Sequence, residues 1–166
     1  NLWQLATVWD RLRRAPTAGR ALPKLVFAGR SGWLNNDFES LMKATGQLGG
    51  WVEIVEGPDD DVLAYLYRNC LFTVTASFYE GWGLPIGESL AYGKTAVVSN
   101  TSSMPEVGGN MVEYCDPHSL DSIEAACLRL IDDPEHRTCL EESIAKAHLR
   151  SWDEVARDML AAIQRP

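Results

Sequence analysis

The sequence lacks two features that would point to nucleic acid or membrane. It has 15 Lys and Arg residues against 23 Asp and Glu residues, a formal net charge of -8, and no basic cluster larger than Arg11, Arg13 and Arg14. An acidic chain of this kind is a poor match for a nucleic-acid surface. No apolar run approaches the roughly 20 residues that a membrane-spanning helix needs. We therefore expect no nucleic-acid partner, and nothing in this chain indicates membrane contact.

The cysteines also lack the spacing of a metal site. There is no C-x-x-C pair and no His at zinc spacing. Reduced thiols in a cytoplasmic protein fit this pattern better than disulfides or metal ligands. We expect a cytoplasmic location. The full-length protein could also be peripheral at the inner face of the membrane. The four cysteines are Cys70, Cys115, Cys127 and Cys139.

Apolar runs and amphipathic segments alternate along the 166 residues, enough chain for one domain with a substantial core. Alternation of strands with helices predicts an α/β, Rossmann-like, doubly wound parallel sheet with helices on both faces. We expect the segment at 51–56 to lie nearer an edge, because its apolar residues alternate. The predicted strands are 25–29, 51–56, 71–77, 95–99 and 111–115, and the main predicted helices are 2–14, about 35–50, 59–67, 85–92, 120–131, 134–149 and a C-terminal tail.

The stretch 78–94 is the centre of the sequence. It places Glu80 and Glu88 eight positions apart, with two glycines and a proline between them. A Val- and Thr-rich run precedes it, and Pro85 suits the first residue of a helix. Strand, glycine turn and helix N-terminus together favour an anion, because glycine lets a ligand approach and the first helical amides are free. The pattern predicts a diphosphate site with a carboxylate on each side.

A plainer interpretation exists for these and other acids. Glu88 could complement the helix dipole as a first-turn acid, and Glu80 could be a solvated loop carboxylate. The run from Asp59 to Asp61 could hold a metal, but acids after a Gly-Pro turn are also an ordinary helix start. Ligands of a parallel sheet bind at the carboxyl ends of its strands. We expect the loops at 29–32, 55–58 and 80–84 to converge there on one cleft.

The motif EGWGLPIGE, residues 80–88, resembles the E-x7-E signature of the retaining glycosyltransferases of sequence family four, enzymes of the GT-B architecture. The likeness continues through TAVVSNTSSMPEVGGNMVEYCDP, residues 95–117. It implies that residues 1–166 are a nucleotide-sugar-binding domain, the C-terminal half of a GT-B fold. The missing partner would be an N-terminal acceptor domain. The implied activity is hexose transfer in polysaccharide biosynthesis, and it is mannosyltransferase-like.

The resemblance assigns the parts of a nucleoside diphosphate sugar to individual residues. Glu88 would accept hydrogen bonds from the ribose diol, and Glu80 would contact the hexose as the catalytic carboxylate. The amides of Gly81 and Trp82 would join Glu80 at the hexose, and those of Gly83 and Leu84 would bind the diphosphate. The family uses protein groups here, so no metal and no cofactor other than the donor substrate is expected.

Further donor contacts are expected from the earlier loops. Val55 matches the segment that lies against the nucleobase in the family. In the turn GRSG, Gly29 and Gly32 would approach the donor, and Arg30 could lend charge or be a surface arginine.

The N-terminus departs from the family pattern. Members carry an Arg and a Lys that grip the diphosphate just before the helix at 2–14, and here the sequence begins at Asn1. The isolated chain is therefore expected to be inactive and to bind nucleoside diphosphates weakly. The strand before those cations is central in the family. We expect either that residues precede Asn1, or that the run at 25–29 pairs directly with the run at 71–77.

Two other functions stay open at this stage. One is a nucleotide-sugar-binding or regulatory module without chemistry of its own. The other is a different GT-B enzyme, such as a sugar-nucleotide epimerase. The sequence leaves open the base (UDP, GDP or ADP), the sugar, the acceptor, the linkage and the oligomeric state.

Overall fold

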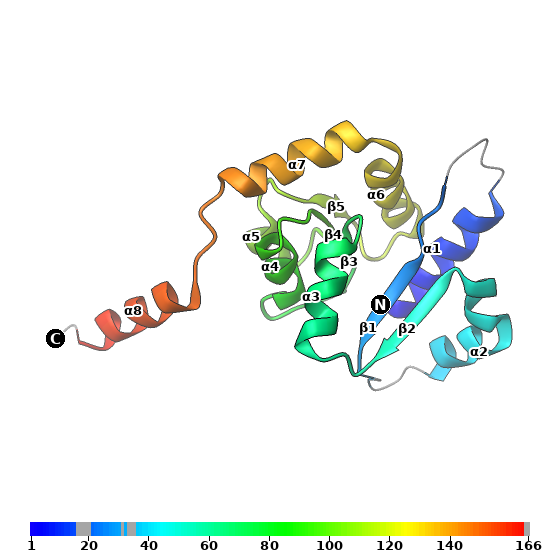
Figure 1. The fold of residues 1–166 in the computed structure, drawn as a ribbon, viewed down its shortest axis with the longest axis horizontal. Helices are drawn as coiled ribbons and strands as arrows, with labels where there is room; N and C mark the ends of the chain where they lie inside the picture. Colours follow the sequence, from blue (N-terminus) through cyan, green and yellow to red (C-terminus); the bar gives the residue numbers. More distant parts are fainter. Residues whose placement is uncertain (16–20, 31, 33–35, 165–166) are drawn as a thin grey trace.

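The computed structural model describes residues 1–15, 21–30, 32 and 36–164. Strands and helices alternate through most of this length, and three helices close the chain (Figure 1). The helices are α1 (Leu2–Arg14), α2 (Asn36–Gly50), α3 (Asp60–Asn69), α4 (Leu84–Ala91), α5 (Met104–Gly108), α6 (Leu120–Asp132), α7 (Pro134–Lys146) and α8 (Trp152–Ile163). The strands are β1 (Leu25–Gly29), β2 (Val52–Glu56), β3 (Thr73–Thr75), β4 (Ala96–Ser99) and β5 (Glu113–Cys115).

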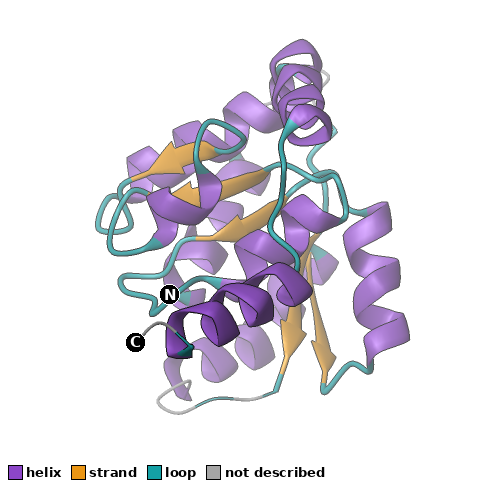
Figure 2. Cartoon of the chain, turned by 90° about the vertical axis from the view of Figure 1, so that its left-hand side faces the viewer, coloured by secondary structure: helices purple, strands orange, loops and turns teal. Residues whose placement is uncertain are grey.

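All pairings among the described strands are parallel. β1 pairs with β2, and β3, β4 and β5 form a second sheet in that order. Figure 2 shows both sheets lying among helices. Parallel pairing needs a crossover between consecutive strands, which the intervening helices supply. The predicted α/β class with a parallel sheet is confirmed. The expected edge position of β2 stays a prediction, because β1 and β2 are both edge strands of their two-stranded sheet.

The strand β4 shows that helices cover both faces of its sheet. All four of its residues are buried. Val97 belongs to a core cluster with residues of α1 and α6, while Ala96 and Val98 belong to another with residues of α4 and α5. Successive side chains of a strand point to opposite faces, so the two clusters lie on opposite sides of the sheet. A strand buried in this way reads as the continuous apolar run seen in the sequence.

The two sheets are not joined through β1 and β3. In the described residues β1 has β2 as its only strand neighbour, and β3 has only β4. Of the two arrangements expected for the run at 25–29, direct pairing with the run at 71–77 is therefore excluded. β1 keeps one open edge, and Val26 in it is 38% exposed although it is apolar.

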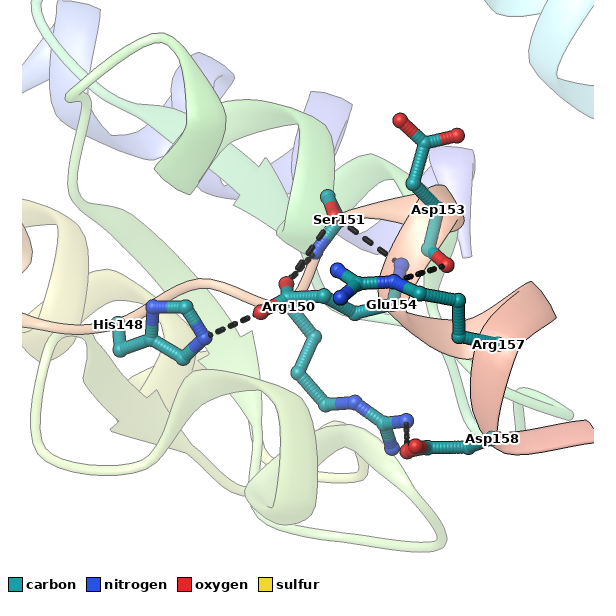
Figure 3. Close-up of polar contacts among 7 residues, drawn as sticks. All are labelled: His148, Arg150, Ser151, Asp153, Glu154, Arg157 and Asp158. Carbon is teal, nitrogen blue, oxygen red and sulfur yellow. Dashed lines mark hydrogen bonds and ion pairs between the residues drawn. The ribbon is translucent and has the colours of Figure 1, made fainter. Parts of the chain in front are cut away.

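The last helix stands away from the sheets (Figure 1). Polar contacts join the linker after α7 to the first turns of α8 (Figure 3). Ser151 and Glu154 form a capping box, and His148 Nε2 lies 2.9 Å from Glu154 Oε1. The backbone and hydroxyl of Ser151 lower the pKa of Glu154. The predicted tail helix is present, but its apolar residues are exposed rather than packed, among them Trp152 (75%) and Ile163 (77%).

No helix in the described part of the chain is both long and apolar enough to cross a bilayer.

Candidate functional site

The turn between β3 and α4 is shaped by Gly83. Gly83 is the N-cap of α4, with φ 84° and ψ 51°, in the left-handed region that favours glycine. A Cβ built at this position would lie 2.9 Å from Ile86 Cδ1, so the Ile86 side chain would have to shift to admit it. The helix begins at Leu84, and Pro85 is its second residue rather than its first. This one-residue shift leaves the predicted strand, glycine turn and helix N-terminus in place.

The start of α4 offers free amides. Among the described residues, the backbone N–H groups of Gly83 and Leu84 donate to no other group. The helix dipole places partial positive charge at the same point, so an anion is favoured there. The chain from residue 77 to residue 93 contains Glu80 and Glu88 but no Lys or Arg. Any charge neutralisation beyond the amides must therefore come from outside this stretch.

Hydrogen bonds hold the side chain, the backbone N–H and the backbone carbonyl of Glu80. Ser77 Oγ donates to Glu80 Oε1 at 2.8 Å, which leaves Oε2 without a partner among the described residues. The Glu80 N–H donates to Ser102 Oγ at 3.2 Å, and Ser103 Oγ donates to the Glu80 carbonyl at 3.0 Å. Thr101 Oγ1 adds a 3.2 Å bond to the carbonyl of Phe78. The loop after β4 thus fixes the backbone of the Glu80 loop through three consecutive hydroxyl side chains.

Ser102, which accepts from the Glu80 N–H, has an uncommon backbone conformation. Its φ is 52°, in the left-handed region, where residues other than glycine are uncommon. Strain of this kind persists where the surroundings hold it in place, and it gathers at functional sites. Here it accompanies the bond between Ser102 and the amide of Glu80.

Glu88 lies in the second turn of α4, and the first turn contains no acid. The plainer interpretation, in which Glu88 is a first-turn acid that complements the dipole, is therefore wrong. Its carboxylate is exposed and accepts a 2.7 Å hydrogen bond from the Tyr67 hydroxyl of α3. Burial, together with the Glu88 carboxylate, raises the pKa of Tyr67, so this phenol stays protonated and donates.

The other residues predicted around the motif are placed near it. Gly81 is exposed and has room around it. Trp82 is 55% exposed and Leu84 53% exposed, both large apolar side chains beside the free amides. Tyr79 is 79% exposed. Gly83 itself is buried, while the residues on either side of it, Trp82 and Leu84, are exposed.

The earlier loops meet one another. Ala28 and Val55 are paired between β1 and β2, and the Gly57 N–H donates to the Gly29 carbonyl at 2.9 Å. Arg30 and Gly32 are exposed, and the residue between them lies outside the described part. Among the described residues no hydrogen bond or ion pair joins these loops to 80–84. Their convergence on one cleft with Glu80 stays a prediction.

The aspartate run is accounted for by the helix that it starts. Asp59 is the N-cap of α3, and its side chain accepts from the Val62 N–H at 2.9 Å. Asp60 and Asp61 lie in the first turn, where acids suit the dipole. In the described part of the chain no group of three or more His, Cys, Asp or Glu side chains is arranged to hold a metal ion.

Sequence reasoning misses three contributors to the site: the loop from Thr101 to Ser103, Tyr67 and Asn1. The side-chain amide of Asn1 donates to the carbonyls of Ala76 (2.7 Å) and Pro117 (3.1 Å) and so links the start of α1 to the chain just after β3 and β5. None of these contacts has a sequence signal, since each joins segments far apart in the chain.

Comparison with known proteins identifies the family of the chain. Residues 3–147 match the family described as glycosyl transferases group 1. The chain belongs to that family. The match and the fold confirm the sequence-based identification of a GT-B glycosyltransferase domain.

Two similar proteins are named as mannosyltransferases. The O-antigen chain mannosyltransferase B of Escherichia coli is 33% identical over 148 residues, which cover 89% of this chain and 39% of that protein. The MMP alpha-(1->4)-mannosyltransferase of Mycolicibacterium hassiacum is 28% identical over 136 residues, 79% of this chain and 33% of that protein. The chain thus spans well under half the length of these two relatives.

Solved structures share the fold. Sucrose-phosphate synthase from Thermosynechococcus elongatus superimposes with a TM-score of 0.77 at 20% identity, covering 98% of this chain and 41% of that one. The catalytic domain of starch synthase IV from Arabidopsis thaliana, bound to ADP and acarbose, gives a TM-score of 0.62 at 13% identity, covering 97% and 42%. At these identities the likeness concerns the fold.

Proposed function

We propose that this domain binds a nucleoside diphosphate sugar and presents its hexose for transfer, with retention of configuration, to an acceptor held by another part of the full-length protein. The observation that carries the proposal is the pair of free amides of Gly83 and Leu84 at the start of α4, between Glu80 and Glu88. Membership of the glycosyl transferases group 1 family supports it. A bound nucleotide sugar would account for the free amides, for Glu80 and for Glu88.

Each part of the donor has a matching group. The diphosphate is anionic and suits free amides at a helix N-terminus. The ribose has two neighbouring hydroxyls, and one oxygen of Glu88 already accepts from Tyr67 while the other has no partner among the described residues. The hexose needs acceptors for its hydroxyls, and Glu80 Oε2 is one that no described residue occupies.

The chemical step needs stabilisation of the leaving diphosphate. Negative charge develops on that group as the bond to the sugar breaks, and donors already aimed at it lower the barrier. The Gly83 and Leu84 amides are held by the helix and need not reorganise. Positive charge from outside residues 77–93, which contain no Lys or Arg, would add to this stabilisation.

For the sugar, mannose is the first candidate. Two similar proteins are named as mannosyltransferases, although the matched regions cover only 39% and 33% of those proteins. The base and the acceptor are left to experiment. A panel of UDP-, GDP- and ADP-sugars, mannose first, assayed with the full-length protein and a glycan acceptor mixture, addresses both.

The sharpest test replaces Glu88 by Ala in the full-length protein. Loss of an acceptor for two ribose hydroxyls should weaken binding of the nucleoside diphosphate by about 1.5–3 kcal/mol, a factor of about 10 or more. Glu135→Ala, an exposed acid in the first turn of α7, is the matched control and should leave affinity unchanged. Calorimetry measures both. Equal affinity of Glu88→Ala and the parent protein would contradict the assignment.

Product analysis separates the remaining functions. Transfer of the hexose to an acceptor, with the anomeric configuration of the donor kept, is expected. Binding without turnover would favour a regulatory module. An altered sugar still joined to the nucleotide would favour an epimerase.

A further inference from the structure

The contact between α3 and α4 contains a group that the donor site does not yet account for. Tyr67 of α3 is half-buried, and its hydroxyl lies 2.7 Å from Glu88 Oε2. Glu88 itself is exposed, so without this bond its side chain would be free to rotate in solvent. A single phenol therefore sets the position of the carboxylate at this site.

The phenol is in turn held by a second aromatic ring. Tyr67 and Tyr92 are stacked, with ring centroids 5.2 Å apart and planes 7° apart. Arg68 adds a cation over the Tyr92 ring, 5.4 Å from its centroid. Glu88 of α4 and Tyr92, the C-cap residue of that helix, are four residues apart, so both lie on the same face, toward α3. The ring stack fixes the direction in which the hydroxyl points, and the hydroxyl fixes Glu88.

The protonated state of the Tyr67 phenol suits this arrangement. Burial and the neighbouring carboxylate raise the pKa of the Tyr67 phenol, which keeps it a donor. A donor that occupies Oε2 leaves Oε1 free to accept, because an ionised carboxylate has about four acceptor positions. Binding a diol to a carboxylate that is already immobilised avoids the entropy cost of ordering that side chain.

We propose that Tyr67 is a positioning residue for the nucleotide, acting through Glu88 to prepare the carboxylate for the ribose diol. The inference rests on the proposed function, in which Glu88 contacts ribose. Tyr67 does not touch the reacting atoms. It raises affinity for nucleotides that carry both ribose hydroxyls.

The test uses Tyr67→Phe, which removes the hydroxyl and keeps the ring stack. In the full-length protein, calorimetry with GDP, UDP and ADP should show affinity about three- to ten-fold weaker than the parent, the range expected for ordering one side chain. Affinity for the corresponding 2′-deoxynucleotides should change little. Tyr65→Phe is the matched control. Tyr65 is on the same helix, is 64% exposed, and its hydroxyl has no partner in the described residues.

A double-mutant cycle separates positioning from a general structural effect. In a Glu88→Gln background, Tyr67→Phe should cost no further affinity, because the two residues act as a unit. Loss of affinity for ribo- and deoxyribonucleotides alike, or the same loss in the Glu88→Gln background, would overturn the inference. Tighter binding by Tyr67→Phe would also overturn it, since Tyr67 would then compete with the ribose.

The two proposals fail in different ways. If the parent protein binds none of the three nucleotides, the proposed function is wrong and this inference falls with it. If the parent binds and Tyr67→Phe binds equally well, only the role of Tyr67 is wrong.

Discussion

Replacing Gly83 by Ala is expected to destabilise the turn at the candidate diphosphate site. Its φ of 84° places an L residue in the left-handed region, which costs roughly 1–2 kcal/mol. The new Cβ would also lie 2.9 Å from Ile86 Cδ1, and Ile86 is fully buried, so a crowding cost of about 1–3 kcal/mol is added. The reduced freedom of the unfolded chain returns about 0.4–1 kcal/mol. We expect a net loss of about 1–4.5 kcal/mol.

A nearby glycine provides the control. Gly81 has no heavy atom within 4 Å of an added Cβ and is not among the residues with positive φ. Gly81→Ala should therefore change the free energy of unfolding by less than about 0.5 kcal/mol. For a domain of this size, the Gly83→Ala loss corresponds to a fall in Tm of roughly 2–18 °C. Thermal unfolding of both variants measures the difference.

The outcome also bears on the function. If Gly83 shapes the amides that face the diphosphate, the folded fraction of Gly83→Ala should bind nucleoside diphosphates more weakly than Gly81→Ala at the same temperature. Equal Tm values for the two variants would refute the conformational reasoning. Equal affinities at equal folded fraction would refute the placement of the diphosphate at Gly83.

Two further predictions concern strain and burial. Ser102→Ala and Ser102→Gly both remove the acceptor for the Glu80 N–H, so both should lower transfer activity by the same amount. Ser102→Gly should be the more stable of the two by about 0.5–1 kcal/mol, because glycine relieves the strain of φ 52°. The reverse order of stability in denaturant unfolding would contradict this. Burial raises the pKa of Cys115 to about 11 and of Cys127 to about 12, so a thiol reagent at pH 8 should label exposed Cys139 and spare these two until the chain unfolds. The folded protein favours the protonated thiols of Cys115 and Cys127, so their stabilising contribution is complete below the ordinary thiol pKa of about 9 and falls as the pH rises beyond it. A free energy of unfolding that does not fall between pH 9 and 11 would argue against burial of these thiols as the cause.

Sequence reasoning succeeded where short-range chemistry decides the structure. The turn before α4 follows from Gly83 and Pro85, because left-handed φ favours glycine and a proline fits the first turn of a helix. Asp59 caps α3 for an equally local reason. The class of fold followed as well, because the alternation of apolar strands with amphipathic helices is visible within short windows.

Strand neighbours were harder to predict. The pattern left two arrangements open for β1, and the structure excludes direct pairing with β3. Periodicity reports which face of a strand is buried, but it does not report which strand lies beside it.

The sequence by itself determined the spacing of Glu80 and Glu88 and the free amides between them, because all of these lie on one continuous turn and helix. Only the tertiary structure decided what holds the two carboxylates in place. Tyr67 reaches Glu88 from 21 residues away, and the Glu80 loop is held from the loop at 101–103, 22 and 23 residues along the chain. Such contacts depend on how α3 and the loop after β4 pack against α4, and packing over that range leaves no periodic signal in the sequence.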